Sequence, residues 1–398
     1  MADVNQLSRA RPPPTREHSR KALKYLDVGL ETALGSGDIK IVRSDFLLNN
    51  DVEACLSRRQ DLEAMERDGV ARVFLPPSEA VLALQAGNRS IAVLSYCWVS
   101  AEHPSAQGVH YLTAVRRFLQ SAHGTHVVGV FWDYASLPQK PRTEQDQDIF
   151  ARALAVMGDL YASTLGTTVM RHQAVAPRPE GLDEGLYNGT PYSARGWTNF
   201  ESAVSSEAIA RAAFFPGFTE TIKELPPKVV EIDGEAPRVE EDGFTTFAEE
   251  VLHHQQWLCC WSANIQLARV LPTSIAIRVQ RYRLSIENAK FTKQTDQAVV
   301  VGLYNKYMSD IGLAFVAMAK PADCRFNGEP ATHGRQRDSQ GVIHYPDGTQ
   351  YEGGWKDYKP DGRGTLYGAS GTRYSGEWKE GVLKRQDADG EDGDAVEP

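Results

Sequence analysis

The chain has 398 residues, 41% of them apolar, which is enough to bury a core and form two or three domains. Its formal charge of −9 excludes general attraction to nucleic acid, because phosphate binding requires clustered Lys and Arg in a basic chain. Five cysteines without a C-x-x-C spacing exclude a zinc ribbon and a disulfide framework. With no apolar run near the ~18 residues that span a bilayer and no signal segment, we expect a cytoplasmic protein.

The N-terminal part divides into an arm and a helical segment. Residues 1–20 are polar, basic and interrupted by Pro12-Pro13-Pro14, which is typical of a disordered arm. Over 21–89 apolar residues recur near helical spacing, and the pair Pro76-Pro77 marks a stop. This second segment is predicted to be a helical lead-in.

Residues 90–320 are predicted to form an α/β domain. Apolar strands over 91–95, 127–132 and 167–170 are separated by amphipathic helices, the second of which has a cap at Thr143. Strands separated by such helices indicate right-handed crossovers and a doubly wound parallel sheet. Ligands of these sheets bind at the carboxyl ends of the strands. The side chains expected to converge at that edge are Ser95, Tyr96, Trp98, Asp133, Ser136 and Arg171.

Two further segments complete this domain. The stretch 222–244 contains Pro226-Pro227 and an acidic run, so it is interpreted as a surface insertion. Helical periodicity resumes at Phe247 and returns over 298–315, and these helices are predicted to form an added layer against the sheet. The pair His253-His254 has no ligand at suitable spacing, and glycine-rich phosphate motifs are missing, so neither a metal nor a bound cofactor is expected.

Residues 321–385 contain an internal repeat. Tyr351-Glu352-Gly353-Gly354-Trp355 recurs as Tyr374-Ser375-Gly376-Glu377-Trp378, and aromatic residues alternating with glycines indicate stacked β-hairpins. The pattern resembles the MORN repeat, Y-x-G-x-W followed by spaced glycines. This resemblance implies a scaffold that binds a protein or a membrane surface; alternatively, the units only cap the main domain. Residues 386–398 are predicted to be an acidic, disordered tail.

Three motifs between 91 and 206 follow a common plan. A strand ends in Leu94-Ser95-Tyr96, the next ends in Phe131-Trp132-Asp133, and the segment Tyr192 to Glu201 keeps the Tyr, Trp and Glu of a Y-x-x-S-x-W-C-x-x-E pattern. This region resembles a divergent TIR domain, in the branch related to the fungal heterokaryon-incompatibility domains. The segment departs from the pattern at Arg195 and Thr198. The resemblance implies a flavodoxin-like fold.

The TIR resemblance also implies a reaction, the hydrolysis of NAD, with Glu201 as the catalytic glutamate. Cleavage between nicotinamide and ribose discharges a pyridinium, so no general acid is needed, and one carboxylate can stabilise the oxocarbenium-like charge. Stacking on a flat base is expected of Trp98 or Trp197. Contacts to ribose or phosphate are expected from Ser95, Arg171 or Arg195.

Other interpretations of the same residues stay open. Thr198 and Glu201 also have the spacing of a capping box, in which hydroxyl and carboxylate bind each other's backbone amides. Asp133 and Ser136 have an alternative role in forming the turn after their strand. Two rival functions follow: a non-catalytic module that self-associates, and a membrane-adjacent scaffold led by the repeats.

Overall fold

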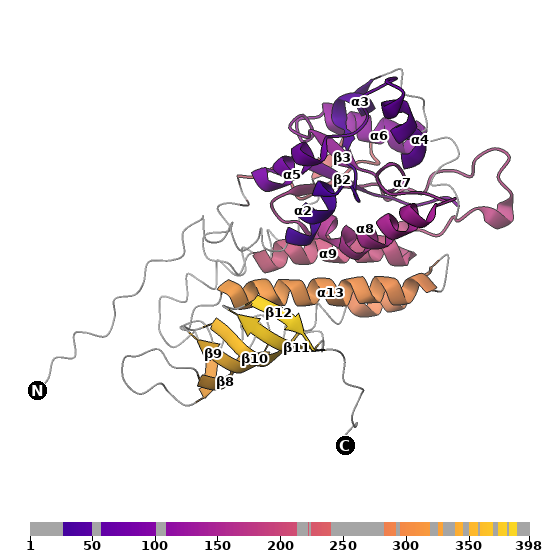
Figure 1. The fold of residues 1–398 in the computed structure, drawn as a ribbon. Helices are drawn as coiled ribbons and strands as arrows, with labels where there is room; N and C mark the ends of the chain where they lie inside the picture. Colours follow the sequence, from indigo (N-terminus) through magenta and orange to yellow (C-terminus); the bar gives the residue numbers. More distant parts are fainter. Residues whose placement is uncertain are drawn as a thin grey trace, which may run out of the picture. The chain divides into compact units, whose positions relative to one another are not determined.

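The computed structural model describes residues 27–49, 57–100, 109–212, 222, 224–239, 282–291, 295–318, 325–328, 339–344, 350–356, 359–368, 373–379 and 382–387 (Figure 1). The predicted arm over 1–20, the helical segment expected from Phe247 and the tail beyond 387 lie outside these residues. The chain forms two compact units. The first comprises Met1–Ser193 and Glu201–Leu252, and the second comprises Ala194–Phe200 and His253–Pro398.

A mixed six-stranded sheet forms the centre of the first unit. Its strands lie in the order β1 (Val42–Arg43), β3 (Gly129–Phe131), β2 (Ile91–Ser95), β4 (Thr167–Arg171), β5 (Val229–Glu231) and β6 (Arg238–Val239). The four inner strands are parallel, whereas β1 and β6 run antiparallel at the two edges, so the predicted all-parallel sheet was wrong at its edges. Counted along the chain, the parallel strands follow the order 2-1-3-4. The direction of winding therefore reverses between β2 and β4.

Helices cover both faces of this sheet. Figure 1 shows α3 (Ser44–Leu48), α4 (Arg59–Arg67) and α6 (Val109–Gln120) on one side of β2 and β3, and α2 (Val28–Gly35) and α8 (Glu144–Ala162) on the other. Three further helices are α5 (Pro77–Ala86), α7 (Asp133–Ser136) and α9 (Gly196–Ala212).

The predicted cap of α8 is confirmed. Thr143 accepts a hydrogen bond from the amide of Asp146, whose side chain binds the Thr143 amide in return, and this capping box satisfies two amides that a helix start leaves unpaired. Strand β2 alternates between the two faces: Leu94 joins the apolar core that includes Tyr111 and Phe118 of α6. The next residue, Ser95, therefore directs its side chain to the opposite face, where α8 lies.

Two segments differ from their predictions. Within its described residues, the lead-in over 21–89 contains four short helices, but also β1, whose two residues are too few to show the alternation of a strand. The described part of the stretch 222–244 is not a surface insertion, because it supplies β5 and β6 of the sheet. Val229 and Val230 are 1% and 0% exposed, and the prolines just before them obscured this short buried strand.

The second unit contains a long helix and the repeat sheet. Helix α13 (Thr295–Met318) confirms the helix predicted over 298–315. The antiparallel sheet runs in chain order through β7 (Arg325–Gly328), β8 (Ser339–His344), β9 (Gln350–Lys356), β10 (Lys359–Tyr367), β11 (Arg373–Lys379) and β12 (Val382–Gln386). Among the described residues, no helix has the length and apolar character needed to cross a bilayer.

Aromatic residues and glycines share the inner face of the repeat sheet. The Tyr351 ring lies edge-on to Trp355 and Trp378, at centroid distances of 5.0 and 5.1 Å. A side chain at Gly364 would place its Cβ 2.0 Å from the Tyr351 hydroxyl, so the tyrosine fills the space that this glycine leaves open. The alternation in the sequence thus reflects ring packing against bare backbone, as the stacked-hairpin prediction required.

Candidate functional site

The strand ends of the first sheet bring two predicted residues together. Ser95 at the end of β2 is the register partner of Arg171 at the end of β4. These strands lie where the winding reverses, which is the place where doubly wound sheets bind their ligands. Both side chains are buried, with exposed fractions of 1% and 6%. The ends of β2 and β4 therefore form the framework of the candidate site.

Glu201 joins this framework from α9. Its Oε2 accepts a hydrogen bond from the Ser95 Oγ at 2.5 Å, and its side chain is only 8% exposed. The Ser95 Oγ also lies 2.6 Å from the Tyr192 hydroxyl, which in turn lies 3.2 Å from the Ser202 Oγ. A carboxyl group and a row of hydroxyls thus meet at one strand end.

Tyr161 of α8 borders the carboxyl group of Glu201 on another side. Its hydroxyl donates to the backbone oxygen of Leu94 at 3.1 Å, and its proximity to Glu201 lowers the pKa of that carboxyl group. Because Ser95 donates to Glu201, the hydrogen bonds that use each proton once run in one direction, from Ser202 through Tyr192 and Ser95 to Glu201.

The raised pKa of Glu201 indicates that its carboxyl group holds a proton at neutral pH. Burial raises the pKa of Glu201 to about 8, against the opposing effect of the Ser95 hydrogen bond, and the nearby charge of Asp133 raises it further. Burial likewise raises the pKa of Tyr192 to about 12. At neutral pH the cluster is therefore mostly uncharged. A cation brought close to Glu201 would favour its ionised form.

Asp133, Tyr96 and Trp98 form a second cluster, in which their polar atoms bind one another. The carboxylate of Asp133 accepts from the Tyr96 hydroxyl at 2.8 Å, from the Trp98 Nε1 at 2.9 Å and from the amide of Tyr134 at 2.7 Å. Burial raises the pKa of Asp133 to about 6. These contacts fit the turn interpretation of Asp133, and they leave the Trp98 ring half-buried at the edge of the cluster.

Ser136 has a structural position. It is fully buried, and its Oγ accepts from the amide of Trp132 at 3.0 Å. This bond closes the single turn of α7, as the alternative interpretation of Ser136 required.

Arg195 and Trp197 belong to the second unit. The backbone of Arg195 forms a bridge with Lys290, and the Trp197 Nε1 donates to Asp296 at 3.4 Å. The capping-box interpretation was wrong, because α9 begins at Gly196 and Thr198 lies inside it, its hydroxyl donating to the Arg195 carbonyl at 3.3 Å. The carboxyl group of Glu201 serves Ser95 instead.

Three residues of the site carried no predicted role. Tyr161 fell on the apolar face of its helix and read as core. Tyr192 was used only as a motif position, and Ser202 was not considered. Hydroxyl groups give no periodic signal. Tyr192 and Ser202 lie close to Glu201 in the chain, which could have suggested them, whereas nothing in the sequence links Tyr161 to Glu201.

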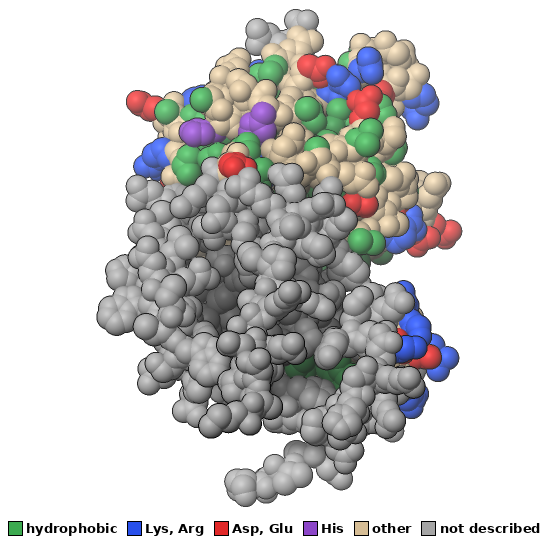
Figure 2. Space-filling model, turned by 90° about the vertical axis from the view of Figure 1, so that its left-hand side faces the viewer, with side chains coloured by type: hydrophobic (Ala, Val, Ile, Leu, Met, Phe, Trp, Pro, Cys, Tyr) green, Lys and Arg blue, Asp and Glu red, His purple; other side chains and the backbone are tan. Residues whose placement is uncertain are grey.

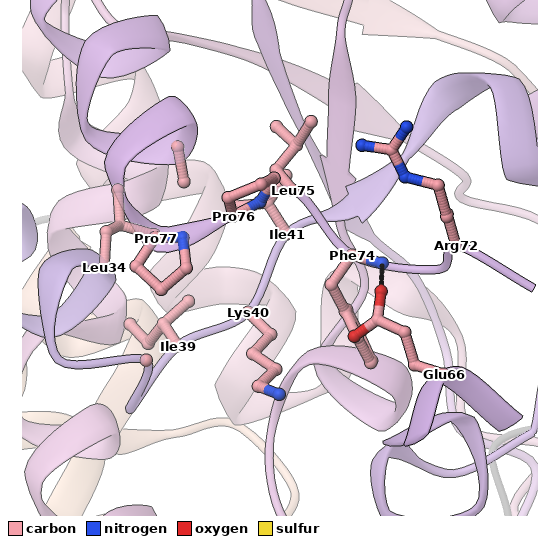
Figure 3. Close-up of a pocket in the computed structure, with 12 residues that line it drawn as sticks. Leu34, Ile39, Lys40, Ile41, Glu66, Arg72, Phe74, Leu75, Pro76 and Pro77 are labelled. Atoms are coloured by element: carbon pink, nitrogen blue, oxygen red, sulfur yellow. Dashed lines mark hydrogen bonds between the residues drawn. The ribbon is translucent and has the colours of Figure 1, made fainter. Parts of the chain in front are cut away.

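A separate pocket of about 300 Å³ lies near the β1 edge (Figure 3). On its rim, Glu66 Oε1 accepts from the amides of Val73 and Phe74 at 3.0 and 2.9 Å, and Lys40 lies over the Phe74 ring. Its lining is Leu34, Gly37, Ile39, Lys40, Ile41, Glu66, Arg72, Phe74, Leu75, Pro76, Pro77 and Ala80, none of them a predicted site residue. Across the part of the chain that the structure describes, no group of His, Cys, Asp or Glu is arranged to hold a metal ion.

Comparison with known families gives one match. Residues 336–350, 351–373 and 374–383 match the family model of the MORN repeat. The strands β8 to β11 therefore lie within MORN repeats. Such repeats commonly take part in membrane or protein interactions. No family match covers residues 91–206, so the TIR interpretation stays a prediction. No curated protein and no solved structure matches the chain significantly.

Proposed function

We propose that the α/β unit is a TIR-like NAD hydrolase with Glu201 as its catalytic carboxylate. The observation that carries this proposal is the Ser95–Glu201 hydrogen bond at the strand ends where the winding reverses. Arg171, the register partner of Ser95, adds a permanent positive charge at the same strand ends. A carboxyl group, a hydroxyl and a guanidinium are the groups that a ribose and a phosphate require.

The chemistry needs one carboxylate. The bond between ribose C1′ and the pyridinium nitrogen breaks, its electron pair leaves with neutral nicotinamide, and water adds to C1′ with loss of a proton to give ADP-ribose. Ionised Glu201 stabilises the positive charge that develops on the ribose. The pyridinium of NAD favours ionisation of Glu201, which offsets the effect of its burial.

Nicotinamide release tests the proposal. Full-length protein is incubated with NAD over a wide range of protein concentration, because self-association is one of the predicted partner modes. Glu201→Gln should reduce turnover at least about 100-fold, a typical loss when a charge-stabilising group is removed. Glu207→Gln is the matched control, since Glu207 is also buried on α9, and it should retain turnover. Equal activity in all three proteins would exclude Glu201 as the catalytic group.

We infer for the MORN sheet a second function, docking to an anionic membrane surface. Pleating places Arg373, Glu377 and Lys379 on the face opposite to the buried Trp378, and pairing adds Arg363 and Arg385 beside Glu377. Figure 2 shows a group of mainly basic side chains at the lower right of that view. Basic residues near a surface attract anionic lipids by about 1 kcal/mol each.

Co-sedimentation with vesicles tests the docking. The full chain should bind vesicles containing phosphatidylserine better than neutral phosphatidylcholine vesicles, and added salt should weaken the binding. No ion pair among the described residues involves Lys356, Arg373 or Arg385, so their charges are available to lipid headgroups. Replacing all three by Glu should therefore abolish vesicle binding. A control with the same charge change at Arg67, Arg72 and Arg178 should still bind. Equal loss in the control would indicate a net-charge effect, and no binding at all would favour a protein partner.

A further inference from the structure

The hydroxyl that a ribose would need in this site is already in use. Ser95 Oγ lies 2.5 Å from Glu201 Oε2 and 2.6 Å from the Tyr192 hydroxyl. The Tyr192 hydroxyl is in turn 3.2 Å from Ser202 Oγ. The Tyr192 hydroxyl thus occupies the position beside Ser95 and Glu201 in which a hydroxyl group of a ligand would be bound.

Tyr192 is buried although its two neighbours in the loop are exposed. The loop from His172 to Arg195 connects β4 to α9 and holds only two short turns, η2 (Glu184–Leu186) and η3 (Tyr192–Ala194). Its neighbours in the chain, Pro191 and Ser193, are exposed, whereas Tyr192 is 6% exposed. The Tyr192 side chain is therefore inserted beside Glu201 from a stretch of the loop whose adjacent residues are exposed.

The Tyr192 ring is held by polar contacts that a ligand can reproduce. Its hydroxyl donates to Ser95 and accepts from Ser202 in the arrangement that uses each proton once. A ribose hydroxyl has the same capacity, one proton to donate and lone pairs to accept. Exchange of one hydroxyl for the other therefore conserves the hydrogen bonds of Ser95 and Ser202.

We propose that Tyr192 closes the site as an internal substitute for a ribonucleoside hydroxyl, and that ligand binding requires its side chain to leave. The closure rests on the geometry around Ser95, whereas the identity of the ligand rests on the proposed function. Tyr192 is accordingly a specificity-determining residue, since a ligand without a hydroxyl at this point cannot replace its hydrogen bonds.

Carbodiimide labelling of Glu201 tests the closure without a ligand. The full-length protein is treated with carbodiimide and glycine ethyl ester, and the peptide with Glu201 is quantified by mass spectrometry. Labelling should be slow in the wild type and at least about 10-fold faster in Tyr192→Ala, because an open site admits the reagent. Tyr187→Ala is the control: Tyr187 lies in the same loop, but its hydroxyl donates to Ala176 O at 2.9 Å. Unchanged labelling in Tyr192→Ala, or an equal rise in Tyr187→Ala, would overturn the closure.

Titration with ADP-ribose tests the substitution of one hydroxyl for another. Tyr192→Phe keeps the ring and loses the competing hydroxyl, so it should bind ADP-ribose at least about 3-fold more tightly than the wild type, with Tyr187→Phe unchanged. Weaker binding in Tyr192→Phe would overturn the inference, because it would make Tyr192 a ligand contact. If labelling responds as expected and no variant binds ADP-ribose, the closure holds and the ribonucleoside ligand, with the proposed function, is wrong.

Discussion

Ser95 donates a hydrogen bond to Glu201 although 106 positions separate the two residues, and the oxygens lie 2.5 Å apart. One residue ends the central parallel strand β2, and the other lies about one turn into α9, the helix that follows β4. The bond therefore depends on the strand order as much as on either residue. It also fixes a carboxyl group in a buried position, which has consequences for stability as well as for catalysis.

The pH dependence of stability should change when Glu201 is replaced by Gln. The pKa of Glu201 is raised from 4.5 to about 8 in the folded protein, so between these values the folded chain holds a proton that the unfolded chain releases. The contribution of Glu201 to the free energy of unfolding is full below pH 4.5 and is lost as pH rises to about 8. Relative to wild type, Glu201→Gln should gain at least about 1 kcal/mol between pH 5 and 8.5, since one pKa unit corresponds to about 1.4 kcal/mol.

Urea unfolding at pH 5.5, 7 and 8.5 measures this difference. Asp27 has a pKa raised to about 7 and titrates in both proteins, so its effect cancels in the comparison. Asp133, whose charge acts on Glu201, has a pKa raised to about 6, so the comparison of pH 7 with pH 8.5, where Asp133 is mostly ionised, isolates Glu201. A constant difference between the two proteins across this range would show that Glu201 is ionised throughout.

Much of the parallel sheet was predictable because its signals are long. Strand β2 was predicted at its observed limits, and β3 and β4 within two residues, since each is an apolar run between amphipathic helices. Strands β1 and β6 have two residues each, too few to show alternation, and the three residues of β5 follow a pair of prolines that indicated a break. Edge and short strands are therefore defined by pairing partners that the local sequence does not contain.

Ser95, Arg171 and Glu201 of the candidate site were predictable from the sequence, whereas the hydroxyl groups of Tyr161, Tyr192 and Ser202 were not. The end of β2 located Ser95, and a motif located Glu201. The residue at which α9 begins determines whether Glu201 caps the helix or joins the cluster around Ser95. The helix begins at Gly196, whose lack of a side chain leaves room for the Phe291 ring. That requirement comes from a residue distant in the chain. Local spacing could not have revealed it.

Ser95→Ala and Ser136→Ala should separate the site from the scaffold. Both hydroxyls are buried and hydrogen-bonded, so each loss should lower the free energy of unfolding by about 1–3 kcal/mol. Ser95→Ala should also raise the pKa of Glu201, because the Ser95 hydrogen bond lowers it, and should reduce NAD turnover. Chemical denaturation and nicotinamide release measure the two effects. Loss of turnover in Ser136→Ala at a temperature where it is folded would contradict this division.

Asp133→Asn should loosen the second cluster. One carboxylate accepts from Tyr96, Trp98 and the amide of Tyr134, and an amide side chain must place a donor group against one of these donors. We expect a loss of about 1–3 kcal/mol in the free energy of unfolding. Since Trp98 loses its anchor, its indole should also become more accessible. Acrylamide quenching in Asp133→Asn, with Trp98→Phe in the same background to isolate that indole, measures the change, and unaltered quenching would place the indole's anchor elsewhere.

Gly364→Ala should destabilise the MORN sheet. The new Cβ would lie 2.0 Å from the Tyr351 hydroxyl, and Tyr351 cannot yield because its ring is fully buried between Trp355 and Trp378. Overpacking of this kind costs about 1–3 kcal/mol. Gly302→Ala is the control within the same unit: Gly302 lies in α13 with nothing within 4 Å of a new Cβ, so alanine should be neutral or stabilising there. Hydrogen exchange of the full-length chain, followed at β9, β10 and β11, should accelerate only in Gly364→Ala, and equal protection in both variants would mean that the sheet tolerates a methyl group beside the tyrosine.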